Sequence, residues 1–317
     1  MIVHNNQPVL SICIPIYNRA EYLKRQFEQF LQCKELFGDK IQLYISDNCS
    51  EEDLDVIAEY YSRKGLLFEY SRNNENIGPD ANFIKCFNSA KGKYVWLLGS
   101  DDIPVDGFVP KLVEILENHD YDYVFLNHQF DDGILSEYNS ATDILEKVHV
   151  WITFISANIF RTEYVGNVRG KDYLNTNLIQ VPFFLEGIVA GGTKAIYNCF
   201  WIQKGSDSAN NGGYNLFKVF VVNLLGILKE KITSGQLTRK DYEVAKKSIY
   251  CNFIAYYVFD ILIIKDKDKV QNFHPDHAWR ILFKYYGKYF YFYTGLARVI
   301  LIRFYKKTMG RKVWWHA

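Results

Sequence analysis

Short apolar runs alternate with longer amphipathic segments over the first part of the chain. The apolar runs, typical of buried strands, lie at residues 9–16, 41–47, 66–73 and 94–98. The segments between them, residues 19–33, 51–65 and 81–92, carry apolar side chains at helical spacing, with charged residues between. Because strands that alternate with helices in this way form βαβ units, we expect residues 1 to about 127 to form a doubly wound, mostly parallel α/β sheet with helices on both faces.

After Tyr121 the pattern is less regular. Residues 121–130 are expected to form another strand, residues 150–160 form an apolar segment of undetermined type, and residues 178–192 read as a helix that ends at Gly191 and Gly192. Helical periodicity returns over residues 215–265. We therefore predict an α/β domain over residues 1–212 and a mainly α-helical region over residues 213–317.

Polar residues follow each of the first four predicted strands. They are Tyr17 and Asn18, then Asp47 and Asn48, then Arg72 with Asn76, and last Asp101 and Asp102. Ligands of open α/β sheets bind outside the carboxyl ends of the strands, so we expect these four loops to converge on one site. Asp47 has a second possible use, because the helix after it begins near Ser50, its expected N-cap, and Asp47 could also cap it.

The stretch "YVWLLGSDDIP", from Tyr94 to Pro104, places two carboxylates side by side where a buried strand ends. Adjacent carboxylates repel each other, and a bound divalent cation would offset that repulsion. A solvated turn is the ordinary explanation for such a pair taken alone. The three companion loops at the same sheet edge favour a metal site.

Composition indicates a globular protein, with 49% hydrophobic and 17% aromatic residues. The six cysteines are scattered without a CxxC pair, and the N-terminal sequence lacks the layout of a secretory signal, so we expect reduced thiols and a cytoplasmic location. The histidines show no zinc-ligand spacing. No nucleic-acid partner is expected, and an oligomer is possible.

The charge is unevenly distributed. Residues 277–317 contain nine Lys or Arg and no Asp or Glu, so a formal net charge of +1 for the whole chain leaves about −8 for residues 1–276. Residues 279–315 also contain thirteen aromatic side chains, and no uncharged apolar run there reaches the ~20 residues of a transmembrane helix. We expect this tail to lie on an anionic membrane surface, at the inner face of the cell membrane. Alternatively, residues 285–302 pack into the core or a dimer interface.

Four motifs together resemble the family 2 glycosyltransferases of GT-A fold. They are "SICIPIYNRAEYL", "YISDNCSEED", "RNNENIGPDANF" and "AKGKYVWLLGSDDIPVDGF". The "LLGSDD" form and the later "FISANIFR" are most similar to small bacterial abequosyltransferase-type enzymes that decorate surface polysaccharides such as O-antigen or capsule.

This resemblance implies inverting transfer of a sugar from a UDP-, CDP- or GDP-type donor to a saccharide acceptor, expected to be lipid-linked, with Mn²⁺ or Mg²⁺ on the diphosphate. Asp101 and Asp102 would hold the metal, with Asp102 also counted as catalytic, and Asp47 would accept a hydrogen bond from the base. The other residues assigned to the nucleotide-sugar by position are Pro15, Tyr17, Asn18, Arg72, Asn76, Gly78 and Ser100.

Two positions depart from the family pattern. Gly99 stands where many members have an Asp, and Ile179-Gln180 stands where the family has the Glu-Asp whose Asp is the general base. Because a glutamine cannot act as a base, we predict that Glu186 takes the acceptor proton. An outward-facing Glu186 is the alternative, and Asp132 and Asp172 are rival bases.

Two other functions remain open. A sugar nucleotidylyltransferase would carry a Gly-rich loop after the first strand, and "IYNRAEYLKR" contains no glycine. A non-catalytic nucleotide- or membrane-binding module of the same fold would be consistent with Gln180.

Overall fold

The structure, a computed structural model, describes residues 7–203 and 212–309, and the side chains of this part as far as residue 305. The described chain forms two compact units. The first contains residues 7–139 and 152–203, and the second contains residues 140–151 and 212–309. Residues 140–151 thus join the helical unit although they come from the middle of the sequence. The domain boundary expected near residue 212 stays a prediction.

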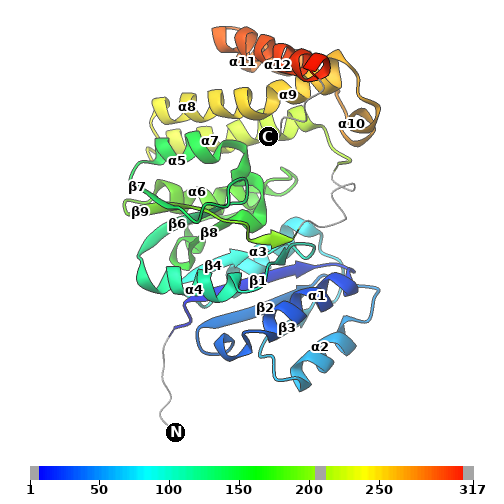
Figure 1. Cartoon of the computed structure of the whole chain (residues 1–317), viewed down its shortest axis with the longest axis vertical. Coiled ribbons are helices and arrows are strands. Elements are labelled where there is room, and N and C mark those ends of the chain that lie inside the picture. The colour runs from blue at the N-terminus through cyan, green and yellow to red at the C-terminus, as the bar shows by residue number, and fades with distance from the viewer. Residues whose placement is uncertain (1–6, 204–211, 310–317) are drawn as a thin grey trace. The chain divides into compact units, whose positions relative to one another are not determined.

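An eight-stranded, mostly parallel sheet forms the centre of the first unit (Figure 1). Its strands, in spatial order, are β3 (Glu69–Arg72), β2 (Ile41–Asp47), β1 (Leu10–Ile16), β4 (Tyr94–Leu97), β8 (Asn158–Arg161), β6 (Tyr121–Asn127), β9 (Thr193–Asn198) and β7 (Leu135–Tyr138). The pairs β1–β2, β2–β3, β1–β4 and β6–β9 are parallel, while β8 runs antiparallel to β4 and β6, and β7 to β9. A two-stranded ribbon pairs β5 (Ile103–Pro104) with β10 (Ile202–Gln203).

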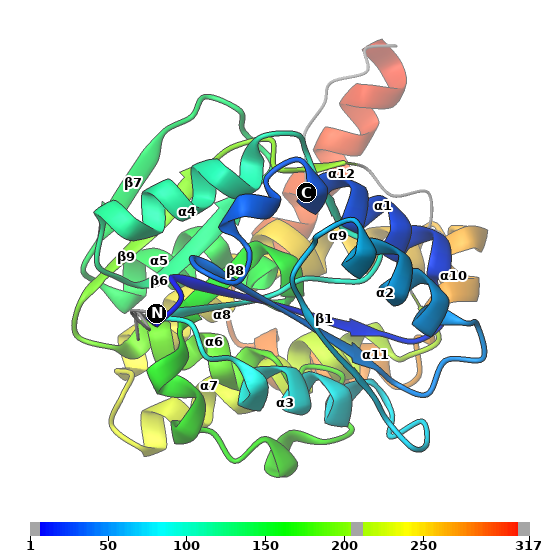
Figure 2. The ribbon, with the colours of Figure 1, turned by 90° about the horizontal axis from the view of Figure 1, so that it is seen from below.

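Helices cover both faces of this sheet, as the sequence predicts. They are α1 (Ala20–Leu31), α2 (Leu54–Arg63), α3 (Pro79–Ser89), α4 (Phe108–Asn118) and α6 (Val181–Val189), with short 3₁₀ turns η1 (Lys34–Leu36), η3 (Ile155–Ala157), η4 (Thr162–Asn167) and η5 (Gly170–Tyr173). The 3₁₀ turn η2 (His149–Thr153) begins in the second unit and ends in the first. Figure 2 shows α3 and α6 on one face and α1, α2 and α4 on the other.

Aromatic side chains join the two helical layers to the sheet. On the α3 and α6 face, the ring of Phe87 stacks on Phe183 at 4.3 Å and meets Phe160 of β8 edge-on. On the opposite face, Trp96 of β4 packs against Phe108 of α4. Each of these five side chains is buried, so both faces of the sheet contribute to the core.

The start of one expected helix and its cap are wrong. The helix predicted over residues 51–65 begins at Leu54, and its N-cap is Asp53, whose carboxylate accepts from the Val56 amide at 3.3 Å. Ser50 is not the cap, because Asp47 binds both its amide and its hydroxyl. The apolar segment of undetermined type contains β8, which lies between β4 and β6 in the sheet.

The second unit is helical. Its elements are α5 (Ala141–Val148), η7 (Lys218–Asn223), α7 (Leu224–Thr233), α8 (Arg239–Ile249), η8 (Tyr250–Ile254), α9 (Ala255–Tyr257), η9 (Val258–Ile263), α10 (Lys267–Asn272), α11 (Ala278–Tyr286) and α12 (Phe290–Met309). The elements α8 to η9 follow one another without a break, and α5 packs against α8. In residues 7–203 and 212–309, no helix has both the length and the apolar character needed to cross a membrane.

A buried carboxylate ties three elements of this unit together. Asp260 of η9 accepts from the Lys269 ammonium of α10 at 2.5 Å and from the Arg303 guanidinium of α12 at 3.0 Å. The Asp260 side chain is 5% exposed, whereas both cations are partly exposed. The pairing therefore fixes α10 and α12 against η9.

We expect Asp260→Asn to lower the free energy of unfolding by about 1–3 kcal/mol, because two cations lose the charge that they share. Chemical denaturation measures this. The control is Glu59→Gln, which removes an exposed ion pair with Arg63 one helical turn away and should cost less than about 0.5 kcal/mol. Equal effects of the two substitutions would contradict a structural role for Asp260.

Candidate active site

A pocket lies at the carboxyl ends of β1, β2 and β4. Its volume is about 290 Å³, and its walls include Tyr17, Asn48, Asn76 and Ser100, one from each of four loops. Pro15 also lines it, as do Arg19 and Asn82, which sequence analysis did not single out. The four loops thus come together in space, although the lining does not include Asn18, Asp47, Arg72, Asp101 or Asp102.

The Asp47 carboxylate is buried at one side of this edge. One oxygen accepts from the amide of Ser50 at 2.9 Å and from its hydroxyl at 2.5 Å. The other accepts from the Tyr70 hydroxyl at 2.7 Å and from the Arg72 guanidinium at 2.9 Å. Four donors occupy the acceptor positions of both oxygens, so one must give way if Asp47 is to bind a base. Base recognition by Asp47 stays a prediction.

The same carboxylate determines where Arg72 points. Arg72 also donates to the Ser50 carbonyl at 2.7 Å, so its guanidinium is held at two points. Burial raises the pKa of Tyr70, and its hydrogen bond to Asp47 adds to that rise, so the phenol stays protonated as a donor. Arg72 is therefore placed before any ligand binds.

Asparagine side chains connect the neighbouring loops. Asn48 donates to Asn76 at 2.8 Å and accepts from the Ile77 amide at 3.0 Å, while Asn76 also accepts from the Gly78 amide at 2.9 Å. Asn18 accepts from the Glu51 amide at 2.9 Å. Gly78 has φ 80°, which a residue with a side chain rarely adopts, and this fixes the loop before α3.

The carboxylate pair has two different environments. Asp101 is partly exposed and forms an ion pair with Arg19 at 2.8 Å. Asp102 accepts a hydrogen bond from the Ser156 hydroxyl, and burial raises the pKa of its carboxyl to about 7, with the nearby charge of Asp101 acting in the same direction. Arg19 reaches Asp101 from a turn in which Asn18 and Arg19 both have left-handed backbone, at φ 58° and 66°.

Two buried side chains hold the loop that carries this pair. Gln26 of α1 donates to the carbonyls of Gly99 at 2.9 Å and Asp102 at 2.8 Å. Ser156 of η3 accepts from the Gly99 amide at 2.7 Å in addition to its bond with Asp102. Both side chains are 0% exposed. The loop is thus fixed from the helix side and from the η3 side.

This arrangement explains the glycine at position 99. A Cβ atom there would lie 2.7 Å from the Asp102 carboxylate and 3.2 Å from the Ser156 hydroxyl. The space that a side chain would need is already filled by these two groups. An Asp at this position and the observed placement of Asp102 exclude each other.

The residues proposed as general base lie elsewhere. Gln180, at the start of α6, donates to the Thr153 carbonyl at 2.8 Å. Glu186 lies in the second half of α6, 3.4 Å from the Asn167 amide, and the adjacent Gly187 packs on the Asp122 carbonyl at the start of β6. Because the start of β6 is at the amino edge of the sheet, Glu186 is not brought to Asp101 and Asp102. Its role as the base stays a prediction that this geometry does not favour.

The rival bases have other partners as well. Asp132 accepts from the Ile134 amide at 3.0 Å, and Asp172 forms an exposed ion pair with Arg169 at 3.7 Å. Arg19, Gln26 and Ser156 were not predicted as site residues from the sequence. Ser156 belongs to the noted "FISANIFR" motif, but a buried Gln within an amphipathic helix gives no signal of its own.

The two aspartates suit one kind of metal site. Over the part of the chain that the structure describes, no group of three or more His, Cys, Asp or Glu side chains is placed to hold a metal ion. Mg²⁺ and Mn²⁺ at phosphate sites are commonly bound by one or two carboxylates together with the phosphate oxygens. A pair of hard oxygen ligands next to Ser100, which lines the pocket, fits a cation that is shared with a bound diphosphate.

Fold and site together define the class of protein. A mostly parallel α/β sheet, with its pocket at the carboxyl edge and a carboxylate pair after β4, is the GT-A arrangement of nucleotide-sugar enzymes. Residues 11–183 match the family described as glycosyl transferase family 2. The chain belongs to this family.

Curated relatives match over part of their length. The abequosyltransferase RfbV of Salmonella typhimurium is 41% identical over 98 residues, which is 30% of this chain and 28% of that protein. The uncharacterized glycosyltransferase MJ1057 of Methanocaldococcus jannaschii is 29% identical over 143 residues, 44% of this chain and 49% of that protein. The chain thus spans less than half the length of these relatives.

Solved structures share the fold. TarS of S. aureus (residues 1–349) in complex with UDP-GlcNAc has a TM-score of 0.59 at 14% identity, over 83% of this chain and 78% of that one. The mannosyltransferase PcManGT of Pyrobaculum calidifontis, in complex with GDP-Man and Mn²⁺, has a TM-score of 0.55 at 10% identity, over 97% and 89%. At these identities the likeness concerns the fold alone.

We expect Ser156→Ala to lower the free energy of unfolding by about 1–3 kcal/mol, because the buried Gly99 amide loses its acceptor and Asp102 loses a donor. Urea denaturation measures the loss. Ser89→Ala, which removes a local bond to the Lys85 carbonyl within α3, should stay within about 0.5 kcal/mol. If Ser156→Ala were as mild as this control, the loop would not depend on Ser156.

Proposed function

We propose that this protein is a glycosyltransferase that moves a sugar from a nucleotide-diphosphate sugar to a saccharide acceptor. The observation that carries the proposal is the pocket itself: in a chain of family 2, Tyr17, Asn76 and Ser100 line one cavity beside the Arg19–Asp101 pair. The complexes of TarS with UDP-GlcNAc and of PcManGT with GDP-Man support a nucleotide-sugar donor.

The nucleotide would occupy the side of the pocket near β2 and β3. The Tyr17 side chain is 40% exposed and offers a ring surface, while Pro15 and the loop from Asn76 to Gly78 form the walls. Arg72, oriented by Asp47, would bind the nucleotide beside Asn18. A UDP, CDP or GDP donor fits this description.

The residues at the loop after β4 would hold Mn²⁺ or Mg²⁺ against the diphosphate. Asp101, the more accessible carboxylate, would be the principal ligand, and Asp102, oriented by Ser156, the second. The cation offsets the negative charge that develops on the leaving nucleotide. Ser100 would face the same diphosphate. The Mn²⁺ bound by PcManGT supports this choice of metal.

The proposed acceptor is inferred from the similar proteins and from the basic, aromatic C-terminal segment. Similarity to an abequosyltransferase over 98 residues supports transfer of a sugar to a saccharide acceptor. Inversion at the transferred sugar and a place in bacterial surface polysaccharide synthesis complete the proposal. A lipid-linked acceptor would place the enzyme at the inner face of the cell membrane. A non-catalytic module of the same fold is the second candidate, because the buried Gln180 occupies the family's base position and is bonded to Thr153.

Release of free nucleotide from a panel of UDP-, CDP- and GDP-sugars, in the presence of lipid-linked saccharides, tests the proposal. We expect Asp101→Asn to lower turnover by about 100-fold or more, since the cation loses its principal charged ligand. EDTA should abolish turnover of the unaltered enzyme, and Mn²⁺ or Mg²⁺ should restore it. Asp106→Asn, which changes an exposed carboxylate nearby, is the control and should be unaffected. No turnover with any donor would favour the non-catalytic module.

The variant Glu186→Gln tests whether Glu186 is the general base. Because Glu186 lies beside Asn167 and away from the strand ends, we expect the variant to keep turnover within a few-fold of normal. A general base would instead contribute about 10²–10⁴-fold, with donor affinity unchanged. A loss of that size in single-turnover measurements, with unchanged calorimetric binding of the donor, would identify Glu186 as the base.

A further inference from the structure

The two last helices of the second unit have one covered side. Ala278, Leu282 and Tyr286 of α11 are buried, and so are Phe292 and Val299 of α12. The α12 helix packs on η8, α9 and η9, with Gly295 so close to Tyr250 that a Cβ atom there would lie 3.0 Å from its ring. Arg303, on the same side, binds Asp260. These contacts fix which side of each helix faces outward.

The outward side is also apolar. Its large exposed side chains are Trp279 and Phe283 of α11, and Phe290, Tyr293, Leu301 and Phe304 of α12. The Phe283 ring also meets the buried Phe292 edge-on at 5.7 Å, so it lies at the border of the covered side. Phe290 is 82% exposed, and Leu301 and Phe304 are 68% and 66% exposed. A surface helix ordinarily turns polar residues to solvent, so a group of large exposed apolar side chains marks an interaction surface. We name these six side chains the outer face.

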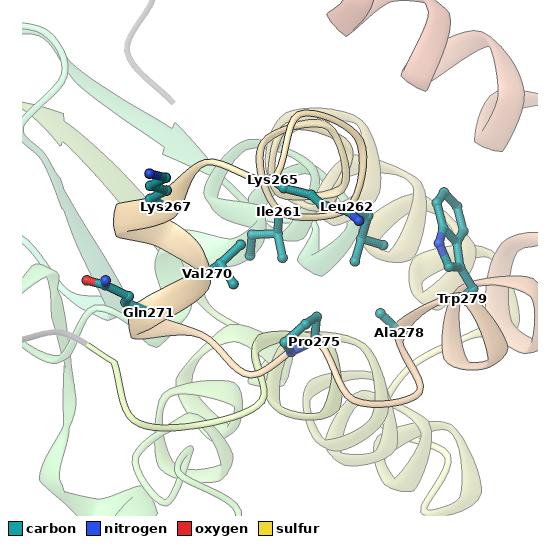
Figure 3. Close-up of a pocket in the computed structure, with 9 residues that line it drawn as sticks. All are labelled: Ile261, Leu262, Lys265, Lys267, Val270, Gln271, Pro275, Ala278 and Trp279. Carbon is teal, nitrogen blue, oxygen red and sulfur yellow. The ribbon is translucent and has the colours of Figure 1, made fainter.

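Exposed cations lie on the same part of the chain as the outer face. Arg280 and Lys284 of α11, Lys288 of the turn after it and Arg298 of α12 are exposed, and residues 277–317 contain no Asp or Glu. Trp279 also lines a recess of about 420 Å³ formed with η9 and α10, where Lys265 and Lys267 lie at the wall (Figure 3). Asp266 and Asp268 alternate with these two lysines, so the excess of positive charge comes from Arg280, Lys284, Lys288 and Arg298.

We propose that the outer face docks on a lipid bilayer that contains anionic headgroups. Aromatic side chains suit the boundary between headgroups and acyl chains, and Lys and Arg around them are attracted to the lipid charge. The helices would lie along the surface, since their other side is committed to the protein. Lys306, Lys307, Arg311 and Lys312 of the predicted tail lie outside the described side chains, and the proposal does not use them.

A second copy of the chain is a weaker candidate for the partner that contacts the outer face. In a two-fold symmetric contact the outer faces would meet, and the four cations of one copy would approach those of the other. No acidic residue of α11 or α12 is available to neutralise them. A surface of anionic lipids supplies the missing opposite charge, which is the reason for choosing it.

Co-sedimentation with vesicles tests the proposal, using phosphatidylcholine with and without phosphatidylglycerol. The full chain should bind the anionic vesicles and lose this binding at high salt, because the headgroup attraction is screened. The double variant Trp279→Ser, Phe283→Ser should bind about tenfold or more weakly, since two aromatic side chains no longer enter the interface. Phe130→Ser is the control, because Phe130 is 56% exposed and Phe283 55%, and it should bind as the unaltered chain does.

Charge is tested separately, in case the aromatic variant folds poorly. The triple variant Arg280→Gln, Lys284→Gln, Lys288→Gln should bind anionic vesicles about 100-fold more weakly. A control with the same change in net charge, Lys24→Gln, Lys111→Gln, Arg169→Gln, removes exposed cations of the first unit and should lose much less. If both triple variants lost the same amount of vesicle binding, the effect would be one of net charge, and the proposed docking surface would be wrong.

The remaining outcomes are also decisive. Absence of vesicle binding by the full chain, or binding that both outer-face variants retain, overturns the proposal. A dimer in sedimentation velocity that the aromatic variant converts to monomer, without vesicle binding, assigns the outer face to a second copy instead. The proposal deepens the proposed function by naming the membrane partner, but vesicle binding needs no catalysis. Turnover of soluble saccharides by an enzyme that ignores vesicles would refute docking alone.

Discussion

The arrangement of the site depends on the hydrogen bonds that Gln26 and Ser156 make to the loop after β4. Gln26 binds the carbonyls at both ends of that loop, and Ser156 binds the Gly99 amide and the Asp102 carboxylate. Ser156 is itself held, because its carbonyl accepts from the Trp96 indole at 2.7 Å. Since α1 and η3 are distant in sequence, the loop reaches this geometry only when the sheet and its covering layers have assembled.

A second buried group has the same effect at the next strand. Removing a carboxylate from water is costly unless donors replace the water, and Asp47 receives four. Those donors come from Ser50, Tyr70 and Arg72, so the loop after β2 and the end of β3 are joined by one charge. The loops at the two ends of the pocket are therefore held in place before a ligand binds, by side chains that the ligand need not touch.

The features that sequence reasoning predicted are local ones. Strand and helix periods, and the polar residues after each strand, depend on neighbours within a few positions, and they gave the α/β fold and the converging loops. The insertion of β8 between β4 and β6 depends on pairing with residues about sixty positions away, which no local pattern encodes. From the sequence, Gly99 was interpreted as a lost carboxylate ligand. The structure shows that Asp102 and Ser156 fill the space that a side chain at this position would need. Glu186 has the right chemistry for a base, but the direction of α6 takes it from the strand ends.

For the C-terminal helices, the composition predicted the kind of surface, but the sequence did not predict which side of each helix faces the protein. Nine cations among thirteen aromatic residues suggested either a membrane surface or a buried segment, and the helices have one side of each kind. The Arg303–Asp260 bond and the close approach at Gly295 leave α12 little freedom to turn its outer face inward. Covering that face by refolding would require breaking both contacts and burying Arg298 and its neighbouring cations without partners, which is far more costly than contact with an external apolar surface.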